Sequence, residues 1–275
     1  MIYEDDQTTL YQCDARNIPI ADQSVNCCVT SPPYWGLRDY GENGQLGQET
    51  TPTAYVANMV EVFGEVRRVL RDDGTLWLNL GDSYANKQLT GIPWRVAFAL
   101  QDDGWILRSE IIWSKPNPMP SPVSDRVTVS HETIFMLTKS ARYYYDADLI
   151  SQPMSRTPDT HGIYSNAGKA RSTQMGGATK GSRQRESENS NKRSVWTIPN
   201  QPYTGAHFAT FPPKLIEPCI LAGCPKGGTV LDPFMGSGTT AYVAKENQRN
   251  AVGCDLNAEY LKLAAGRLRQ SVLAL

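Results

Sequence analysis

The alternation of apolar and polar residues divides the chain into short strands and longer helices. An apolar run over residues 24–30 ends at two consecutive prolines, which cannot continue a strand ladder, so it predicts a strand that stops there. Residues 52–70 place apolar side chains at helical spacing, and Pro52 suits a first helical turn. The turn residues 72–74 then lead into a second apolar strand over residues 75–80.

The same alternation continues towards the end of the chain. The further strands that the pattern predicts are residues 105–113, 132–138, 229–232 and 251–255, and the further helices are residues 93–100, 212–221, 239–247 and 258–268. Because strands and helices alternate, the sequence predicts an α/β fold with a mostly parallel sheet covered by helices on both faces.

The pattern fails from Ser151 to about Arg193. This stretch contains five glycines, many small polar residues and almost no aliphatic ones, so it cannot build a core of its own. A loop this long inside a compact domain is uncommon and usually functional or mobile. We therefore expect a catalytic part over residues 1–150, a basic insertion over residues 151–200, and a cofactor-binding part of the same catalytic domain over residues 201–275.

The charge of the chain is unevenly distributed, although the total is only −1. Residues 151–200 hold eight basic and three acidic residues, a net charge of +5, so the remainder carries −6. This asymmetry favours an anionic partner, although a solvated surface loop would also account for it. The basic residues of the insertion are Arg156, Lys169, Arg171, Lys180, Arg183, Arg185, Lys192 and Arg193.

Length and composition narrow the class of protein further. The 275 residues are 40% hydrophobic and 20% charged, which suits one folded α/β domain with a modest insertion. No apolar run reaches the length of about 18 residues that a membrane helix needs, and the acidic start, MIYEDDQTTL, lacks the apolar core of a secretory signal. Six cysteines are too sparse for a disulfide framework, and no Cys/His spacing resembles a zinc site. We expect a cytoplasmic protein without a metal.

The first motif that indicates chemistry is D-P-F-M-G-S-G-T-T over residues 232–240, between a strand and a helix. Gly236 and Gly238 would let the backbone approach a ligand, and the helix N-terminus offers free N–H groups to an anion. Asp255 ends the next strand, where an acid can bind ribose hydroxyls. Neither GxGxxG nor GxxxxGK[ST] is present, which favours a nucleoside with a small carboxylate over a dinucleotide or a nucleoside triphosphate.

The second motif, T-S-P-P-Y-W over residues 30–35, follows the first predicted strand. Ligands of open α/β sheets bind at the carboxyl ends of strands. A proline turn with an aromatic residue behind it is the alternative, but the neighbouring nucleoside-binding candidate favours a site. Gly81, Asp82 and Ser83 also follow a strand and fit a site or a structural turn equally well.

Together the two motifs resemble those of amino-methylating DNA methyltransferases, which use S-adenosyl-L-methionine. The catalytic signature [DNS]-P-P-[YFW] is matched by Ser31, Pro32, Pro33 and Tyr34, and it precedes the glycine-rich motif, as in the circularly permuted β group of that family. The resemblance implies a Rossmann-like methyltransferase fold, a target-recognition region in the insertion, and a base pocket near His131 and Glu132. The residues that it assigns to the cofactor site are Asp14, Ala15, His207, Phe208, Asp232, Pro233, Phe234, Gly236, Ser237, Gly238, Thr239, Thr240 and Asp255.

The chemistry of that family follows from its target, an exocyclic amino group with a delocalised lone pair. The resemblance implies that the Ser31 side chain and the Pro32 carbonyl accept hydrogen bonds from this group, which localises the lone pair for attack on the sulfonium methyl. The base would leave the duplex and stack on Tyr34. No catalytic cysteine is expected, and Cys219 and Cys224 are predicted to be buried in or beside a helix.

Several alternatives remain open at this point. Serine in the first position of the motif goes more often with N4 of cytosine and aspartate with N6 of adenine, so we prefer N4-cytosine and keep N6-adenine as the alternative. RNA or a small molecule as substrate, and a non-catalytic DNA-binding subunit, are more distant hypotheses. The expected partners are double-stranded DNA and, by resemblance, a second copy of the chain in a homodimer; a restriction partner is not indicated by any residue.

Overall fold

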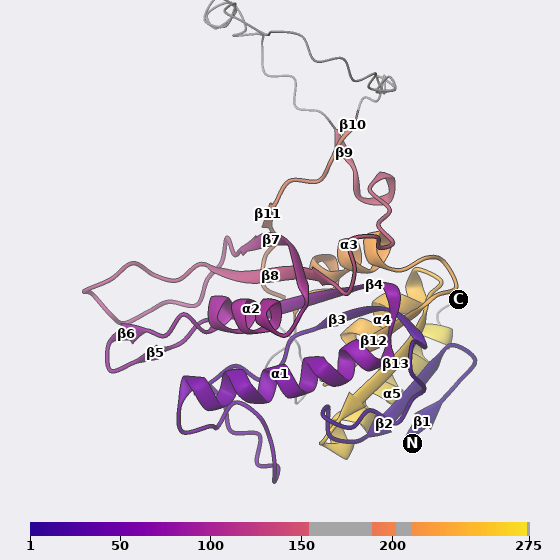
Figure 1. Ribbon diagram of the computed structural model, residues 1–275, viewed down its shortest axis with the longest axis horizontal. Coiled ribbons are helices and arrows are strands. Elements are labelled where there is room, and N and C mark those ends of the chain that lie inside the picture. The colour runs from indigo at the N-terminus through magenta and orange to yellow at the C-terminus, as the bar shows by residue number, and fades with distance from the viewer. Residues whose placement is uncertain (154–188, 202–210, 274–275) are drawn as a thin grey trace, which may run out of the picture.

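Strands and helices alternate along most of the chain in the computed structural model, which describes residues 1–153, 189–201 and 211–273 (Figure 1). The strands are β1 (Tyr3–Glu4), β2 (Thr8–Gln12), β3 (Val25–Thr30), β4 (Leu70–Leu80), β5 (Tyr84–Ala85), β6 (Gln88–Leu89), β7 (Ile106–Ser114), β8 (His131–Thr138), β9 (Gln152–Pro153), β10 (Asn189–Ser190), β11 (Val195–Thr197), β12 (Thr229–Asp232) and β13 (Asn250–Asp255). The helices are α1 (Pro52–Val69), α2 (Ile92–Asp102), the short 3₁₀ helix η1 (Asp148–Ile150), α3 (Pro213–Gly223), α4 (Thr239–Glu246) and α5 (Ala258–Leu273). Among the described helices, none is long and apolar enough to span a membrane.

Nine of the described strands form one sheet in the order β1-β2-β13-β12-β3-β4-β8-β7-β11. The five strands from β2 to β4 in that order are parallel, whereas β8 runs antiparallel to both of its neighbours. The central pair joins distant parts of the chain, because β3 and β12 are neighbours with Cys28 opposite Leu231. The carboxyl ends of β3 and β12, and with them both sequence motifs, therefore lie at the same edge of the sheet.

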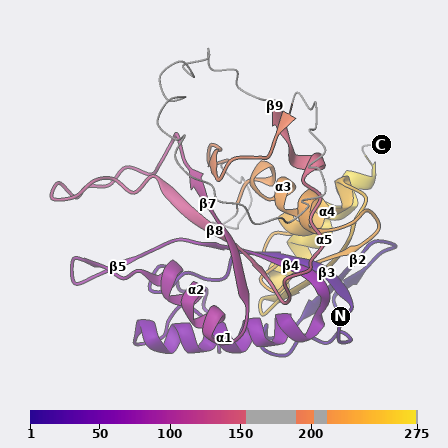
Figure 2. The same cartoon turned by 45° about the horizontal axis from the view of Figure 1, so that its top comes forward.

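Helices cover both faces of the sheet, as the alternation of strands and helices predicts. Helices α1 and α2 lie together on one side, and α3, α4 and α5 on the other (Figures 1 and 2). Strand β3 contributes side chains to the hydrophobic core on each face of the sheet. Cys27 and Val29 pack with α3 and α4, and Cys28 packs with α1. Such a strand, buried on both faces, needs the continuous apolar run that the sequence shows.

The structure differs from the predicted elements in several places. The turn expected at residues 72–74 lies instead within β4, as an irregular stretch between the pairs Val25–Leu70 and Cys27–Thr75. The sequence pattern missed β1, β2 and β11, which are short and lie at the outer parts of the sheet. Predicted helix 258–268 continues to residue 273. Strands β1 and β11 have only two and three residues, too few for a period of two to stand out.

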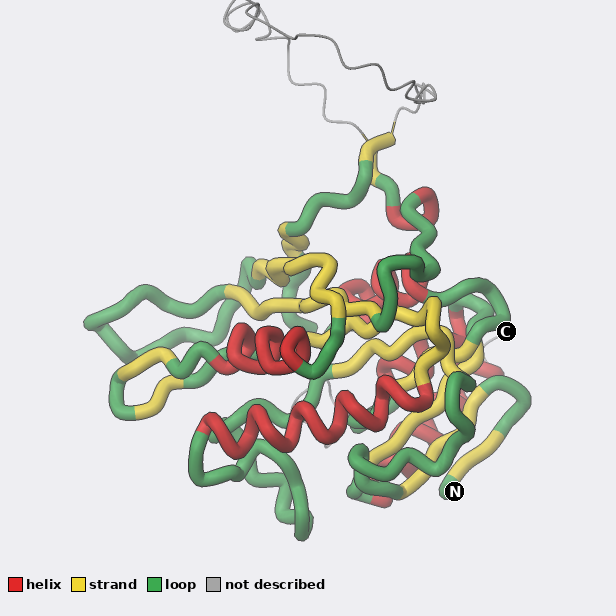
Figure 3. Tube along the Cα trace, viewed as in Figure 1, coloured by secondary structure: helices red, strands yellow, loops and turns green. Residues whose placement is uncertain are grey.

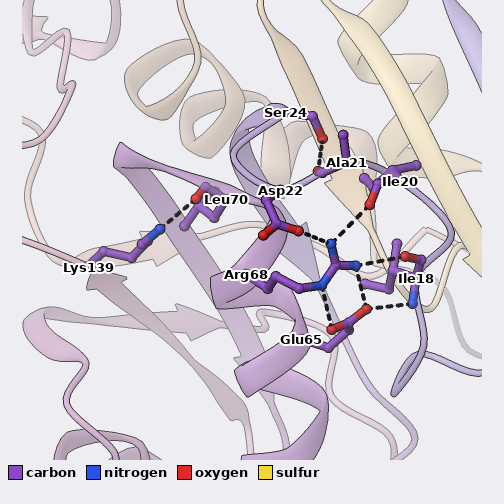
Figure 4. Close-up of polar contacts among 9 residues, drawn as sticks. All are labelled: Ile18, Ile20, Ala21, Asp22, Ser24, Glu65, Arg68, Leu70 and Lys139. Atoms are coloured by element: carbon purple, nitrogen blue, oxygen red, sulfur yellow. Dashed lines mark hydrogen bonds and ion pairs between the residues drawn. The ribbon is translucent and has the colours of Figure 1, made fainter.

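An arginine at the end of α1 fixes the connection between β2 and β3 (Figure 4). The guanidinium of Arg68 donates to the Ile18 carbonyl at 2.9 Å and to the Ile20 carbonyl at 3.1 Å, and it pairs with Asp22 and Glu65. The Glu65 carboxylate also accepts the Ile18 N–H at 2.9 Å. Pairing with Arg68 lowers the pKa of Glu65 below its ordinary value. These bonds hold the connection that follows Asp14 and Ala15 and leads into β3.

A projection extends from the sheet beside β7 and β8. The β5–β6 hairpin and the loop between β7 and β8 project together in Figure 3. The guanidinium of Arg126 lies 3.6 Å from the ring centroid of Tyr84, and Lys87 pairs with Asp125 at 3.8 Å. The loop contains four prolines between Lys115 and Val123, so its backbone has few accessible conformations.

Candidate active site

A cavity of about 620 Å³ opens at the carboxyl edge of the parallel strands. This is the position at which open α/β sheets bind ligands, and the volume suits a nucleoside-sized molecule together with a second small group. From the sequence motifs, the cavity wall includes Asp14, Ala15, Ser31, Pro32, Pro33, Tyr34, Pro233, Phe234, Gly236 and Asp255. The catalytic and cofactor motifs therefore share one cavity, although about 200 residues separate them in the chain.

The turn at residues 31–34 is held in place by contacts with α1 and with the residue that follows β4. Tyr55 of α1 donates its hydroxyl proton to the Pro33 carbonyl at 2.9 Å. Among the described residues, none donates to the Pro32 carbonyl, which stays available to a ligand. Gly81 packs against the ring of Tyr34 so closely that a Cβ atom there would lie 2.6 Å from ring atom Cε2. These contacts hold the turn in place.

A polar network joins Ser31 to three strands behind it. The Tyr34 hydroxyl donates to Oε2 of Glu132 at 2.7 Å and accepts from Nδ2 of Asn79 at 2.7 Å. Ser31 donates its hydroxyl proton to the Tyr34 oxygen at 3.1 Å. The second carboxylate oxygen of Glu132 pairs with Lys115, whose ammonium lies 4.1 Å from the ring centroid of Trp113. All of these residues line the cavity.

The network keeps the Tyr34 hydroxyl protonated. Burial, and then the neighbouring Glu132 carboxylate, raise the pKa of Tyr34 well above its usual range. A phenol that keeps its proton can donate it to a carboxylate, which only accepts. The charge of Glu132 is compensated by its ion pair with Lys115. The side chains of both residues are less than one-fifth exposed. A buried carboxylate without such a partner would carry a large desolvation cost.

The glycine-rich motif begins at a buried carboxylate, Asp232, which is 2% exposed. Asp232 accepts hydrogen bonds from Thr30 at 2.7 Å, from Thr240 at 2.6 Å and from the Phe234 N–H at 3.0 Å. Burial raises its pKa to about 6 in spite of these bonds. Because Thr30 directly precedes Ser31, Asp232 ties the two motifs together beneath the cavity.

The two glycines of the motif have different surroundings. Gly236 lines the cavity, has φ of +50°, and donates its N–H to Oδ2 of Asp255 at 2.9 Å. Gly238 has φ of +80° and faces α5, where an added Cβ would lie 2.8 Å from the Cβ of Ala264. Gly236 therefore lies at the cavity wall, whereas the missing side chain of Gly238 admits the packing of a helix.

Five predicted cofactor residues lie behind the cavity wall, where they support the loop: Asp232, Ser237, Gly238, Thr239 and Thr240. Asp14 lines the cavity, but its carboxylate pairs with Arg16 at 2.6 Å, and this pairing lowers the pKa of Asp14. His207 and Phe208 lie outside the described residues.

Burial raises the pKa of Asp255, whose two carboxylate oxygens accept the N–H groups of Gly236 and Asn257.

The predicted DNA-contact residues lie mostly outside the described part of the chain, which contains only Lys192 and Arg193. The ammonium of Lys192 lies 5.1 Å from the ring centroid of Trp196, and Arg193 is exposed. The residues from Arg156 to Arg185 that the sequence singles out are not described.

Sequence reasoning missed much of the cavity wall. The missed residues include Leu37, Arg38, Tyr40, Glu42, Asn79, Lys115, Asn117, Met119, Asn257 and Tyr260. The spacing of Trp113 and Lys115, two apart at the end of a predicted strand, was a usable signal because such residues share a face. Of the two hypotheses for residues 81–83, a structural turn holds for Asp82, whose carboxylate accepts the N–H groups of Gly91 and Ile92 and so caps α2.

The two cysteines in and beside α3 lie in the core, away from the cavity. Cys219 and Cys224 are free and buried, as predicted, and burial raises the pKa of the Cys224 thiol to about 12. Within residues 1–153, 189–201 and 211–273, no group of three His, Cys, Asp or Glu side chains is placed to hold a metal ion.

The mixed sheet with a parallel centre and helices on both faces has the Rossmann-like fold of S-adenosyl-L-methionine-dependent methyltransferases. Residues 25–266 match the N6_N4_Mtase family model, described as DNA methylase, and the chain belongs to that family. It is an S-adenosyl-L-methionine-dependent DNA methyltransferase of the amino-methylating N4/N6 type.

Relatives and solved structures agree with this assignment. The chain is 44% identical to the type II methyltransferase M.XycI of Xanthomonas campestris pv. cyanopsidis, over 95% of this chain and 88% of the relative. It is also 44% identical to M.SmaI of Serratia marcescens, over 88% and 84% of the two chains. TTHA0409 of Thermus thermophilus, solved with S-adenosyl-L-methionine, superposes with a TM-score of 0.65 at 25% identity and covers 95% of this chain and 93% of its own. The cytosine-N4-specific PvuII methyltransferase shares the fold, with a TM-score of 0.70 at 21% identity, covering 95% of this chain and 86% of its own.

Proposed function

We propose that this enzyme transfers the methyl group to N4 of a cytosine that has been rotated out of duplex DNA. The observation that carries the proposal is the meeting of the Ser31–Tyr34 turn and the glycine-rich loop in one cavity. The neutral hydroxyl of Ser31, in the position where the N6-adenine group more often has aspartate, favours cytosine. N6 of adenine is the alternative, since both bases offer an amino group beside a ring nitrogen.

The residues that would hold the cofactor are those of the cavity wall near β12, β13 and β2. S-adenosyl-L-methionine supplies an electrophilic methyl group on a sulfonium. Asp255 lies where a ribose would bind, and the Gly236 backbone allows close approach to the ligand. Phe234 offers an apolar wall to the adenine ring, and Asp14 offers a carboxylate near it. Asp232 and Thr240 act indirectly by keeping the loop in place.

The residues that would act on the target amino group are Ser31 and Pro32. The Pro32 carbonyl and the Ser31 oxygen can each accept one N–H of the amino group, which draws its lone pair out of the ring. The turn would thus hold the nitrogen in line with the methyl group that the cofactor would supply, whose bond to sulfur would break as the N–C bond forms and one amino proton is lost. Correct placement by these residues would provide much of the rate acceleration. Tyr34 bounds the space that the base would enter. The amino group is paired inside a duplex, so the base must leave the helix first.

The basic insertion is proposed to contact the DNA backbone. Its net charge of +5 contrasts with −6 for the rest of the chain, and such a patch attracts phosphates in a salt-dependent way. The short antiparallel pair β9–β10 stands at the base of this insertion, with Asn189 opposite Pro153. We assign target recognition to residues 151–200 and the cofactor part to residues 201–275 of the same domain.

Two further features belong to this proposal. The catalytic turn precedes the glycine-rich loop in the chain although β3 and β12 are neighbours in the sheet, which supports the permuted order of the β group. A homodimer is expected from the resemblance to that group.

The decisive experiment incubates the protein with labelled cofactor and duplex DNA, digests the DNA to nucleosides and identifies the modified base by mass spectrometry. N4-methylcytosine is expected. N6-methyladenine alone would show that the target base is adenine, and methylation of RNA with none of DNA would overturn the proposal. Absence of transfer to both DNA and RNA would refute the proposal and leave a small-molecule substrate or a non-catalytic DNA-binding subunit.

A further inference from the structure

The direction of the hydrogen bonds around Ser31 is determined by a carboxylate on another strand. A hydroxyl has one proton to donate and two lone pairs that accept. Glu132 has no proton to donate when it pairs with Lys115, so the Tyr34 proton must point towards Oε2 of Glu132, at 2.7 Å. The Tyr34 oxygen is then left as an acceptor.

Two donors use that acceptor oxygen. Nδ2 of Asn79 donates to it at 2.7 Å, and the same amide nitrogen is 2.9 Å from Oε2 of Glu132, which fixes the orientation of the amide. The hydroxyl of Ser31 donates to it at 3.1 Å. Ser31 thereby places its only proton on Tyr34, while its contact with Asn79 at 3.4 Å is long and uses a lone pair weakly. A lone pair of Ser31 is left for a ligand.

The direction matters because the target amino group lies beside a ring nitrogen that accepts hydrogen bonds. A serine that donated its proton to that ring nitrogen would draw the amino lone pair further into the ring and make the amino group a poorer nucleophile. A serine that only accepts an N–H has the opposite effect. An aspartate has no such ambiguity, since an ionised carboxylate cannot donate. A serine enzyme needs a device that fixes the direction of its hydroxyl.

We propose that Tyr34, Glu132 and Lys115 are that device: positioning residues that direct the Ser31 proton away from the base, so that Ser31 acts as an acceptor only. This inference rests on the proposed function, in which Ser31 binds the target amino group. Glu132 comes from β8 and Lys115 follows β7, and the antiparallel register that sets Trp113 opposite Glu132 brings the two charges together. Tyr34 transmits the direction to Ser31.

The test is a set of double-mutant cycles in single-turnover methyl transfer with saturating cofactor and a DNA duplex that the wild-type enzyme methylates. Tyr34→Phe keeps the ring and removes the hydroxyl, and Glu132→Gln keeps the shape and removes the charge. Each is expected to lower the rate constant by roughly tenfold, the effect of one hydrogen bond of this kind, with dissociation constants for cofactor and DNA unchanged. The matched control is Tyr143→Phe, which removes a tyrosine hydroxyl that accepts from Arg108 away from the cavity and should leave the rate unchanged.

The discriminating result is the loss of these effects when Ser31 has no hydroxyl. In a Ser31→Ala enzyme, Tyr34→Phe and Glu132→Gln should change the residual rate by less than about twofold, since the proton that they direct is gone. Effects that multiply with Ser31→Ala would overturn the proposal. If the Ser31→Ala rate is too low to measure, the Tyr34→Phe/Glu132→Gln double variant decides. A double variant no slower than the slower single variant supports a single series of hydrogen bonds through Tyr34 and Glu132. Effects of the two substitutions that multiply overturn the proposal. A wild-type enzyme that methylates no DNA would instead refute the proposed function.

Discussion

Gly81 and Tyr34 are in direct contact, and the contact leaves no room for a side chain on the glycine. A Cβ atom at position 81 would lie 2.6 Å from Cε2 and 2.9 Å from Cδ2 of the tyrosine ring. The ring carries the hydroxyl that joins Ser31 to Glu132. The absence of a side chain just after β4 therefore leaves room for the aromatic ring of the turn that follows β3.

Replacing this glycine should damage catalysis more than folding. Gly81→Ala is expected to push the Tyr34 ring aside, lower the methyl-transfer rate by at least about tenfold, and cost about 1–3 kcal/mol of unfolding free energy. The matched control is Gly64→Ala in α1, where an added Cβ meets no atom within 4 Å. That change should preserve activity and add about 0.5–1 kcal/mol of stability. Single-turnover kinetics measure the methyl-transfer rate, and urea unfolding measures the free energy of unfolding. A Gly81→Ala enzyme with the wild-type rate would show that the position of the Tyr34 ring does not affect catalysis.

The buried carboxylate beneath the cavity should make stability depend on pH. The pKa of Asp232 is raised from 3.8 to about 6, so folding favours its protonated form. The contribution of this preference to the free energy of unfolding is fully present below about pH 4, the ordinary pKa range of an aspartate. It is lost as the pH rises through the pKa of about 6 that Asp232 has in the folded protein. The loss is at most about 3 kcal/mol, because each pKa unit corresponds to about 1.4 kcal/mol.

The measurement is urea unfolding between pH 4 and pH 8. Subtracting the profile of Asp232→Asn from that of the wild type should leave a fall in unfolding free energy over this window, since the amide does not titrate. Asp6→Asn, at an exposed position near the N-terminus, serves as the control and should give a profile parallel to the wild type. Parallel profiles for Asp232→Asn as well would mean that burial does not perturb this carboxylate.

The central strands and both motifs were predictable from the sequence because each depends on local order. Strand β3 ends where two prolines stop it, and the glycine-rich loop follows β12 directly. The partners of Ser31 were not predictable in the same way. Lys115 and Glu132 meet through the register of the antiparallel pair β7–β8, and Asn79 joins them from β4. A side-chain pattern gives the face of a strand but not which residue of the next strand lies opposite.

The same limit applies to the glycine-rich motif itself. A positive φ is required at both Gly236 and Gly238, and the sequence cannot tell which of them faces a ligand. That distinction depends on α5, which packs Ala264 against Gly238 from a position more than twenty residues later in the chain. The structure shows that the missing side chain of Gly238 admits the packing of α5, and its predicted contact with the cofactor stays a prediction.

Ser31 should be needed for turnover and not for cofactor binding. Ser31→Ala removes one of the two acceptors proposed for the amino group, and a reduction of about a hundredfold or more in the methyl-transfer rate is expected, comparable with the loss of one preorganised group in other active sites. Calorimetric binding of S-adenosyl-L-methionine should be unchanged, because the glycine-rich loop is intact. Ser24→Ala, just before the other end of β3, is the control for a lost serine hydroxyl. Unchanged turnover in Ser31→Ala would refute the role of Ser31.

The basic insertion should dominate the salt dependence of DNA binding. Each phosphate contact that is lost reduces the slope of log K against log salt by about 0.9, so Arg171→Gln with Lys180→Gln should flatten it by about 1.8 if both residues bind phosphates. The control is the double variant Arg71→Gln with Lys226→Gln, which removes the same charge. These two residues lie near the amino ends of β4 and β12, at the edge of the sheet opposite the cavity. Because both double variants have the same net charge, a general field effect would lower affinity equally in the two. A flatter slope in the insertion variant alone assigns the phosphate contacts to residues 151–200, and equal slopes in all three proteins would place the DNA on another surface.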